Sequence, residues 1–340
     1  MRVSLNQIAD HQRRRGGSCQ QEPPLRFSYP TRILESSNTH FLLMSSLSVP
    51  THSVVAPSSQ KTLRVAIQGV RGAFHEIAAR EFFGPAVEPV PASSFPALFA
   101  QSADPSQTDA AVLAIENSIA GTILGNYMLL QTSDLVVIGE AFLRIQQNLL
   151  TLPGVSLSDL QEVHSHPMAL AQCADFFKHH PHIRLVESED TAASAAHINR
   201  QQLRHVGAIA STLAAELYGL DVLAPSIEDN PVNFTRFLAV QRRADALPVP
   251  GADKVSVSFV TSHQPGSLSR ILSMLATQSA NLTKIQSVPL LGRAWEYRFF
   301  VDFSVRNPNT LPATLRLLDV MTADCKVLGV YRAALNNYES

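Results

Sequence analysis

A hydroxyl and a guanidinium are adjacent in the stretch Asn233-Phe234-Thr235-Arg236-Phe237. The stretch follows a loop with Asn230 and Pro231 and leads into the apolar run 238–240, which predicts a loop entering a strand. A strand end suits a site, because the strand fixes the backbone while the loop side stays open. A hydroxyl can donate and accept hydrogen bonds, and a guanidinium can pair bidentately with a carboxylate.

Two alternatives stay open for this stretch. Taken alone, these five residues favour an ordinary edge strand, and the other motifs along the chain shift the balance toward a site. Adjacent side chains of a strand point to opposite faces, so Thr235 and Arg236 cannot both face one cleft from a regular strand. Either the loop is distorted, or Arg236 braces the lobes of the structure.

Further polar side chains lie where predicted strands end and predicted helices begin. The apolar strand 110–115 ends in Glu116-Asn117-Ser118 and then Gly121, and open α/β sheets bind ligands at such strand ends. Asp190, Thr191 and Ser211 stand at helix starts, and Ser165 precedes a helix expected from Met168 to about Lys178. Capping is the alternative role of these side chains. His164 and His166 do not predict a metal site, because no Cys or carboxylate pattern supplies further ligands.

Composition narrows the class of protein. The chain has 340 residues, of which 45% are hydrophobic and 16% charged, which indicates a globular protein of two or three domains. The formal net charge of -1 gives no indication of a nucleic-acid or anionic-membrane partner. The 3 cysteines are far apart, which excludes a disulfide framework and fits a reducing, cytoplasmic compartment. No apolar run approaches the roughly 20 residues of a membrane helix.

The pattern of elements predicts four segments. Residues 1–60 are rich in Ser, Pro and Gln and are expected to be a disordered extension; an organelle leader is less favoured than a true start at Met44. Residues 62–242 alternate strands and helices, which predicts two α/β lobes with mostly parallel sheets and a cleft. Residues 243–253 contain Pro and Gly and form a linker. Residues 254–335 follow the order βαββαβ of a ferredoxin-like domain, with a hairpin around Leu291-Gly292-Arg293.

These motifs together resemble the prephenate dehydratase family from about residue 63 to 331. The matching motifs are Gly72-Ala73-Phe74, Glu116-Asn117-Ser118, Ser165-His166-Pro167, Asp190-Thr191-Ala192 and Asn233-Phe234-Thr235-Arg236-Phe237. Pro265-Gly266-Ser267-Leu268 and Asn281-Leu282 resemble an ACT domain. The resemblance implies an α/β fold with a two-lobed, periplasmic-binding-protein-like catalytic domain and a C-terminal ferredoxin-like ACT domain.

The resemblance also implies a reaction, the decarboxylating dehydration of prephenate to phenylpyruvate on the route to phenylalanine. Thr235 falls on the family's essential threonine, and we expect its hydroxyl to assist the leaving hydroxide. No metal or organic cofactor is implied. The expected substrate-contacting residues are Asn117, Ser118, Gly121, Ser165, Gln172, Thr191, Ser211, Asn233, Arg236 and Phe237.

The ACT resemblance implies an L-phenylalanine effector and a homodimer or homotetramer. The expected effector residues are Pro265, Gly266, Ser267, Leu268, Asn281 and Leu282. Gln286 and Val288 replace a charged pair of the family pattern, which weakens the case for ordinary feedback. Elsewhere, Phe74 is followed by His75 where the family has serine, and Met128 stands where the family has an acidic residue. The rival hypotheses are an arogenate dehydratase, whose substrate carries an amino group instead of the keto group, and a non-catalytic amino-acid sensor.

Overall fold

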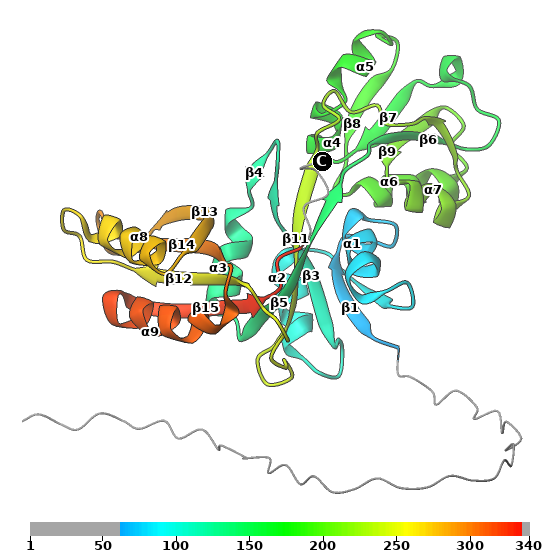
Figure 1. Cartoon of the computed structure of the whole chain (residues 1–340). Helices are drawn as coiled ribbons and strands as arrows, with labels where there is room; N and C mark the ends of the chain where they lie inside the picture. Colours follow the sequence, from blue (N-terminus) through cyan, green and yellow to red (C-terminus); the bar gives the residue numbers. More distant parts are fainter. Residues whose placement is uncertain (1–61, 335–340) are drawn as a thin grey trace, which may run out of the picture. The chain divides into compact units, whose positions relative to one another are not determined.

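The computed structural model describes residues 62–334, and the expected disordered extension lies outside the described residues (Figure 1). The first lobe is built mainly from the beginning of this range. Its elements are β1 (Arg64–Gln68), α1 (Phe74–Phe83), β2 (Glu88–Ala92), α2 (Phe95–Ala103), β3 (Ala110–Asn117), β4 (Gly121–Thr122), α3 (Leu124–Thr132) and β5 (Leu135–Arg144). Apolar residues fill β3 up to Ile115, and all of them are buried because the strand is covered on both faces.

The second lobe is formed by the middle of the chain. Its elements are β6 (Asn148–Thr151), β7 (Glu162–Ser165), α4 (Pro167–Ala171), α5 (Ala174–Lys178), β8 (Arg184–Glu187), α6 (Thr191–Gln201), β9 (Val206–Ala210), α7 (Thr212–Tyr218) and β10 (Asp221–Ala224). The chain then returns to the first lobe through β11 (Phe234–Arg242). Figure 1 shows β5 and β11 side by side where the chain passes between the lobes.

The C-terminal part has the predicted order βαββαβ. It consists of β12 (Lys254–Val260), α8 (Ser267–Thr277), β13 (Ala280–Pro289), β14 (Tyr297–Val305), α9 (Leu311–Met321) and β15 (Ala323–Tyr331). One face of its sheet packs against α8 and α9, with Phe259 and Phe303 in that core. Residues of the other face, such as Phe300 and Leu328, join the core around α3 of the first lobe.

The described strands form two sheets. Ten strands make one sheet with the main order β13-β14-β12-β15-β5-β11-β3-β1-β2, and five make the other, ordered β10-β6-β9-β7-β8. The predicted α/β fold with two lobes is confirmed, since each sheet has its own helices and core. A single parallel bridge, Gly329 to Val137, joins the C-terminal strands to the first lobe. A Cβ on Gly329 would lie 2.3 Å from the carbonyl oxygen of Val137, so only glycine permits this approach.

Three predictions about the elements are wrong. The sheets are mixed rather than mostly parallel, because β11 returns antiparallel between β3 and β5. For the same reason β11 is an interior strand, not the edge strand that residues 233–237 taken alone favour. The helix expected from Met168 to Lys178 is divided into α4 and α5, with Cys173 in a non-helical conformation between them.

Candidate active site

A cavity of about 400 Å³ lies between the lobes, and we call it the cleft cavity. The first lobe contributes the start of β11, the end of β3 and the start of α1, and the second lobe contributes α4 and the start of α6. Five of the expected site residues line it. They are Asn117, Gln172, Thr191, Thr235 and Phe237. Apolar side chains such as Phe95 and Ile123 complete the wall, so much of the cavity is weakly polar.

Thr235 reaches this cavity from an interior strand, opposite Asn117 on β3 and Leu143 on β5. Its hydroxyl oxygen accepts a hydrogen bond from Nδ2 of Asn117 at 3.0 Å. The oxygen of the same Asn117 amide accepts from the backbone N–H groups of Ile119 and Ala120, which fixes the amide's orientation. Because Asn117 occupies the acceptor side of the hydroxyl, the Thr235 proton is free to be donated into the cavity.

Hydrogen-bonded side-chain amides extend from Asn117 to the second lobe. Oδ1 of Asn233 accepts from Asn117 at 2.8 Å, and its Nδ2 donates to Oε1 of Gln172 at 3.0 Å. Nε2 of Gln147 donates to the same Gln172 oxygen at 3.2 Å. Asn233 is fully buried and does not line the cleft cavity, so the structure places it behind the lining residues, where it holds Asn117 and Gln172.

His75 lies in the wall of the cleft cavity at the position where a serine contact was in doubt. Its Nε2 accepts the backbone N–H of Ala114 at 3.2 Å, and its ring meets Phe237 edge-on at 5.0 Å. Burial lowers the pKa of His75 to about 3, so the ring is neutral near pH 7. A neutral ring that accepts at Nε2 carries its proton on Nδ1. His75 can therefore offer a neutral donor or pack against substrate, but it supplies no positive charge.

Arg236 does not line the cleft cavity, which corrects the expectation that it contacts substrate. The regular alternation of β11 turns it to the opposite face, where only 5% of the residue is exposed. Its Nε donates to Glu140 at 2.8 Å, its Nη1 to Asp302 at 2.5 Å and its Nη2 to the Tyr331 hydroxyl at 3.0 Å. Asp302 and Tyr331 belong to the C-terminal part, so Arg236 braces that part against the first lobe.

Ser118 and Gly121 also lie outside the cleft cavity. They line a second cavity of about 590 Å³, which we call the rear cavity, together with Asn117, Arg236 and Asn281. The Ser118 hydroxyl accepts the backbone N–H of Phe234 and donates to the carbonyl of Val232. Ser118 therefore ties the loop before β11 to the end of β3 instead of facing the cleft cavity.

Ser165 and Ser211 are buried by structural hydrogen bonds and do not line the cleft cavity. Ser165 donates to the carbonyl of Ile209 at 2.7 Å, and the expected cap of α4 is instead provided by His166. Ser211 caps α7 and donates to the carbonyl of Gly72 at 2.6 Å, which links the lobes. The capping alternative holds for Ser211, and the expected substrate contacts of both serines find no support in the geometry.

The electrostatics of the cleft cavity are dominated by acidic and neutral groups. Glu189 and Asp190 line it, whereas no Lys or Arg is among its described lining residues. Asp190 caps α6 by accepting the N–H of Ala193 at 2.8 Å. Burial raises the pKa of Asp190. An anionic ligand would therefore rely on backbone N–H groups and neutral donors such as Thr235.

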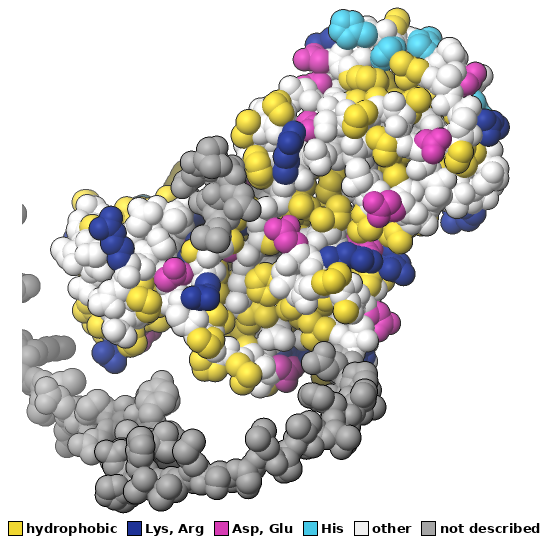
Figure 2. Space-filling model, turned by 45° about the vertical axis from the view of Figure 1, so that its right-hand side comes forward, with side chains coloured by type: hydrophobic (Ala, Val, Ile, Leu, Met, Phe, Trp, Pro, Cys, Tyr) yellow, Lys and Arg dark blue, Asp and Glu magenta, His cyan; other side chains and the backbone are white. Residues whose placement is uncertain are grey.

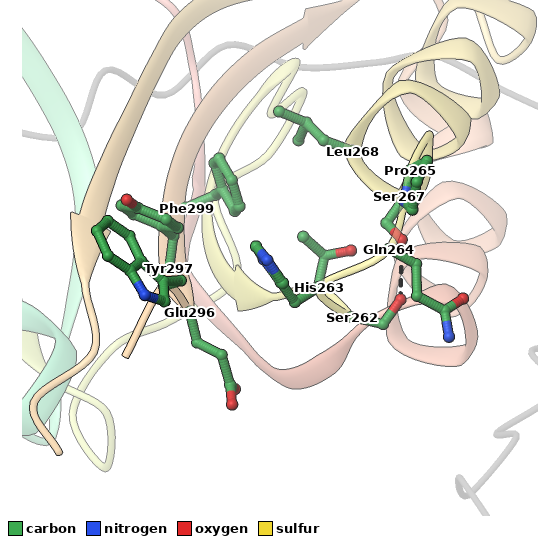
Figure 3. Close-up of a pocket in the computed structure, with 11 residues that line it drawn as sticks. Ser262, His263, Gln264, Pro265, Ser267, Leu268, Glu296, Tyr297 and Phe299 are labelled. Atoms are coloured by element: carbon green, nitrogen blue, oxygen red, sulfur yellow. Dashed lines mark hydrogen bonds between the residues drawn. The ribbon is translucent and has the colours of Figure 1, made fainter. Parts of the chain in front are cut away.

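The expected effector residues are divided between two cavities. Pro265, Ser267 and Leu268 line a pocket of about 380 Å³ in the C-terminal part, while Asn281 and Leu282 line the rear cavity. Figure 3 shows His263 within this pocket, on the side of the aromatic rings of Tyr297 and Phe299. Gly266 begins α8 in the left-handed conformation, with φ of 79°, so its role is to shape the loop.

The remaining surface offers little further chemistry. Figure 2 shows histidines gathered near the end of the lobe that carries α5, and basic and acidic side chains interspersed on the face shown. Among residues 62–334 no group of three or more His, Cys, Asp or Glu is arranged to hold a metal ion. None of the helices in that range is long and apolar enough to cross a membrane.

Sequence reasoning missed Gln147 and Glu189 as lining residues and treated Asp190 only as a helix cap. Gln147 belongs to the crossing segment between the lobes, where three consecutive polar residues, 146–148, interrupt apolar strands. That interruption was the available signal, because a polar run within a buried crossing segment must find partners or face a cavity.

Comparisons with known proteins agree on one family. Residues 65–245 match the family described as prephenate dehydratase. Over 258 residues the chain is 42% identical to arogenate dehydratase 2 of Petunia hybrida, covering 71% of this chain and 64% of the plant protein. It is 36% identical to the bifunctional chorismate mutase/prephenate dehydratase of Aquifex aeolicus, covering 82% and 76%. The solved prephenate dehydratase of Arthrobacter aurescens in complex with L-Phe is 30% identical, with a TM-score of 0.71 and coverage of 79% and 90%.

Proposed function

Because this chain belongs to the prephenate dehydratase family, we propose that it converts prephenate to phenylpyruvate, carbon dioxide and water in the cleft cavity. The observation that carries the proposal is the Thr235 hydroxyl, which lines the cavity and is held as a donor by Asn117. Thr191 and Gln172 line the same cavity and supply further polar contacts.

The chemistry follows from the substrate. The bond between the ring and its carboxylate breaks, its electron pair enters the ring, and the bond to the ring hydroxyl breaks as the ring becomes aromatic. Hydroxide is a poor leaving group, so a donor aimed at the developing charge lowers the barrier. Thr235 supplies that hydrogen bond, and Asn117 polarises its hydroxyl. The departing hydroxide takes up one proton from solvent and leaves as water. The apolar wall with Phe237 suits a departing carboxylate, which is lost more readily where it is weakly solvated.

The test is a turnover assay of the full chain with prephenate. We expect phenylpyruvate to form at a rate proportional to enzyme concentration, because the donor and the apolar wall are already assembled. The assay quantifies phenylpyruvate against an enzyme-free control, since prephenate also decomposes in acid. No catalysed formation of phenylpyruvate from prephenate by folded protein would contradict the proposal.

Dehydration of arogenate to phenylalanine is the second candidate. Arogenate differs from prephenate only by an amino group in place of the side-chain keto group. The acidic lining with Glu189 and Asp190 favours this candidate, because a protonated amine is attracted by carboxylates that repel a dianion.

We also propose that residues 254–335 form an ACT domain that binds L-phenylalanine. The support is the order βαββαβ and the pocket lined by Pro265, Ser267 and Leu268. The pocket has aromatic walls, Tyr297 and Phe299, that suit a phenyl ring, and a polar loop at its mouth. Asn281 and Leu282 lie outside this pocket. One ligand would therefore contact both groups of effector residues only if it bound between two copies of the chain.

Isothermal titration of the full chain with L-phenylalanine tests this regulation. We expect saturable heat below millimolar concentration and a marked loss of it in Leu268→Asp, because a buried carboxylate would oppose an apolar ring. L-Alanine, which lacks the ring, is the matched control ligand. Absence of heat up to millimolar concentration would contradict an effector site. We further propose that the protein is a homodimer or homotetramer and acts in the cytoplasm.

A further inference from the structure

Two ion pairs join the C-terminal part to the first lobe at the end of β3 and the start of β11. Nζ of Lys284 on β13 lies 2.7 Å from Oε1 of Glu116, and Nη1 of Arg236 lies 2.5 Å from Asp302 on β14. Glu116 and Arg236 are cross-strand partners in the first lobe. Lys284 and Asp302 are cross-strand partners in the C-terminal part. The four residues therefore form an array in which the charges alternate in sign.

This array lies next to the two side chains that meet in the cleft cavity. Asn117 follows Glu116 on β3, and Thr235 precedes Arg236 on β11. Asn117 and Thr235 are also cross-strand partners, joined by the hydrogen bond of 3.0 Å. Successive side chains of a strand point to opposite faces. The C-terminal part therefore holds one face of the strand pair, and the other face presents the Thr235 hydroxyl to the cleft cavity.

Lys284 also holds the short ladder that orients the Asn117 amide. Its Nζ donates to Oγ1 of Thr122 at 2.8 Å, and Thr122 is the partner of Glu116 in the pairing of β3 with β4. This ladder has two residue pairs, and the turn between its strands contains residues 119–120, whose N–H groups hold the Asn117 oxygen. A ladder of this length is only marginally stable by itself. Because Lys284 binds both strands, it fixes the turn.

Lys284 is enclosed by the contact between the C-terminal part and the first lobe. Only 7% of its side chain is exposed, and its Nζ lies 5.7 Å from the centroid of the Tyr127 ring. Val288, four residues further along β13, is buried in the core around α3. The ammonium is thus held by packing as well as by its two oxygen partners, so its removal changes the support of the turn.

We propose that Lys284 is a positioning residue for the dehydration, which acts through Asn117 on the Thr235 hydroxyl. By binding Glu116 and Thr122 it holds the turn that directs the Asn117 amide, and that amide sets the direction in which Thr235 donates. Lys284 does not line the cleft cavity, so it acts without touching the substrate. The inference rests on the proposed dehydratase function and makes the C-terminal part necessary for full turnover even when no effector is bound.

The experiment measures kcat and KM for prephenate in the full chain and in three variants. Lys284→Met removes the ammonium and keeps a side chain of similar length, while Lys284→Arg restores a cation beside Glu116. Lys326→Met is the matched control, because Nζ of Lys326 also joins the C-terminal part to the first lobe but donates to carbonyls at the end of α3. Both methionine variants are also made in the Thr235→Ala background, and thermal melting verifies that each protein is folded.

We expect Lys284→Met to lower kcat about tenfold with KM changed less than about threefold, since a full displacement of 1 Å costs roughly 100-fold. Lys284→Arg should stay within about threefold of the unaltered chain, because a guanidinium also pairs with a carboxylate. In the Thr235→Ala background, Lys284→Met should lower kcat less than about twofold, because the hydroxyl that the turn directs is absent. Lys326→Met should show no such dependence on Thr235.

Three results would overturn the inference and leave prephenate dehydration standing. They are an unchanged kcat in folded Lys284→Met, an equal loss of kcat with and without the Thr235 hydroxyl, and an equal loss in Lys326→Met. If Lys284→Met does not fold, Thr122→Val removes one partner of Nζ with little change of shape, and kcat should fall about threefold, whereas an unchanged kcat would overturn the inference. Absence of turnover by the unaltered chain would instead contradict the proposed function.

Discussion

Replacing Thr235 by alanine is expected to lower kcat for prephenate about 10²- to 10³-fold, the typical loss when one donor to a developing oxyanion is removed. The loss should appear in kcat, because the hydrogen bond from Thr235 strengthens only as the bond between the ring carbon and the hydroxyl oxygen breaks. Formation of phenylpyruvate under saturating prephenate measures the effect.

The fold should survive this substitution. Nδ2 of Asn117 keeps two other acceptors, Oδ1 of Asn233 and the carbonyl of Phe234. Thr235→Ser preserves the hydroxyl and is the matched control, and we expect its kcat to stay within about tenfold of the unaltered chain. If Thr235→Ala retained full kcat, or if serine were as inactive as alanine in a folded protein, the donor role of the hydroxyl would be excluded.

Replacing Arg236 by methionine is expected to destabilise the fold without removing a substrate contact. The change leaves the carboxylates of Glu140 and Asp302 buried, with Lys254 as the nearest remaining cation at 2.7 Å from Glu140. Breaking one side of a buried ion pair costs about 3–5 kcal/mol, because the other charge stays desolvated. Differential scanning calorimetry should show the melting temperature lowered by roughly 10 °C.

Two controls separate this bracing role from a role in binding. Arg243→Met removes an exposed pair with Asp134, and such pairs contribute at most about 1 kcal/mol. Arg236→Met combined with Asp302→Asn should recover part of the loss, because one buried charge no longer lacks its partner. A large increase in KM with an unchanged melting temperature would mean that Arg236 contacts substrate after all.

Prolines explain one element that sequence patterns missed. β2 has the sequence EPVPA, and proline argues against a strand because it cannot donate to the ladder. The structure places β2 at the end of the sheet, where β1 is its one neighbour among the described strands. An edge strand needs no backbone N–H donors on its unpaired side, so prolines are tolerated there. Which strand lies at the edge depends on the whole sheet and cannot be predicted from the local sequence.

Sequence signals correctly predicted the features that depend on residues a few positions apart, such as helix caps and turns. Asp190 and Ser211 were predicted to start helices, and both side chains accept the N–H three residues on. The hairpin around Leu291 and the order of elements after residue 253 follow from alternation and turn residues, which act over a few positions. The sequence by itself therefore determined most of the elements and the family, and it singled out residues 233–237 as the candidate site.

Only the tertiary structure decided which of these polar residues share a cavity. Thr235 and Arg236 are neighbours in sequence, yet the pleat of β11 sends one to the cleft cavity and the other to Glu140 and Asp302. Serine is a residue type that often contacts ligands. The hydroxyls of Ser165 and Ser211, however, donate hydrogen bonds to backbone carbonyls that lie 44 and 139 positions away in the chain. Gln147 shares the oxygen of Gln172 with Asn233, a residue 86 positions further along the chain. The physical reason is that hydrogen-bond partners and strand faces are assigned by long-range contacts, which residue type and spacing do not specify.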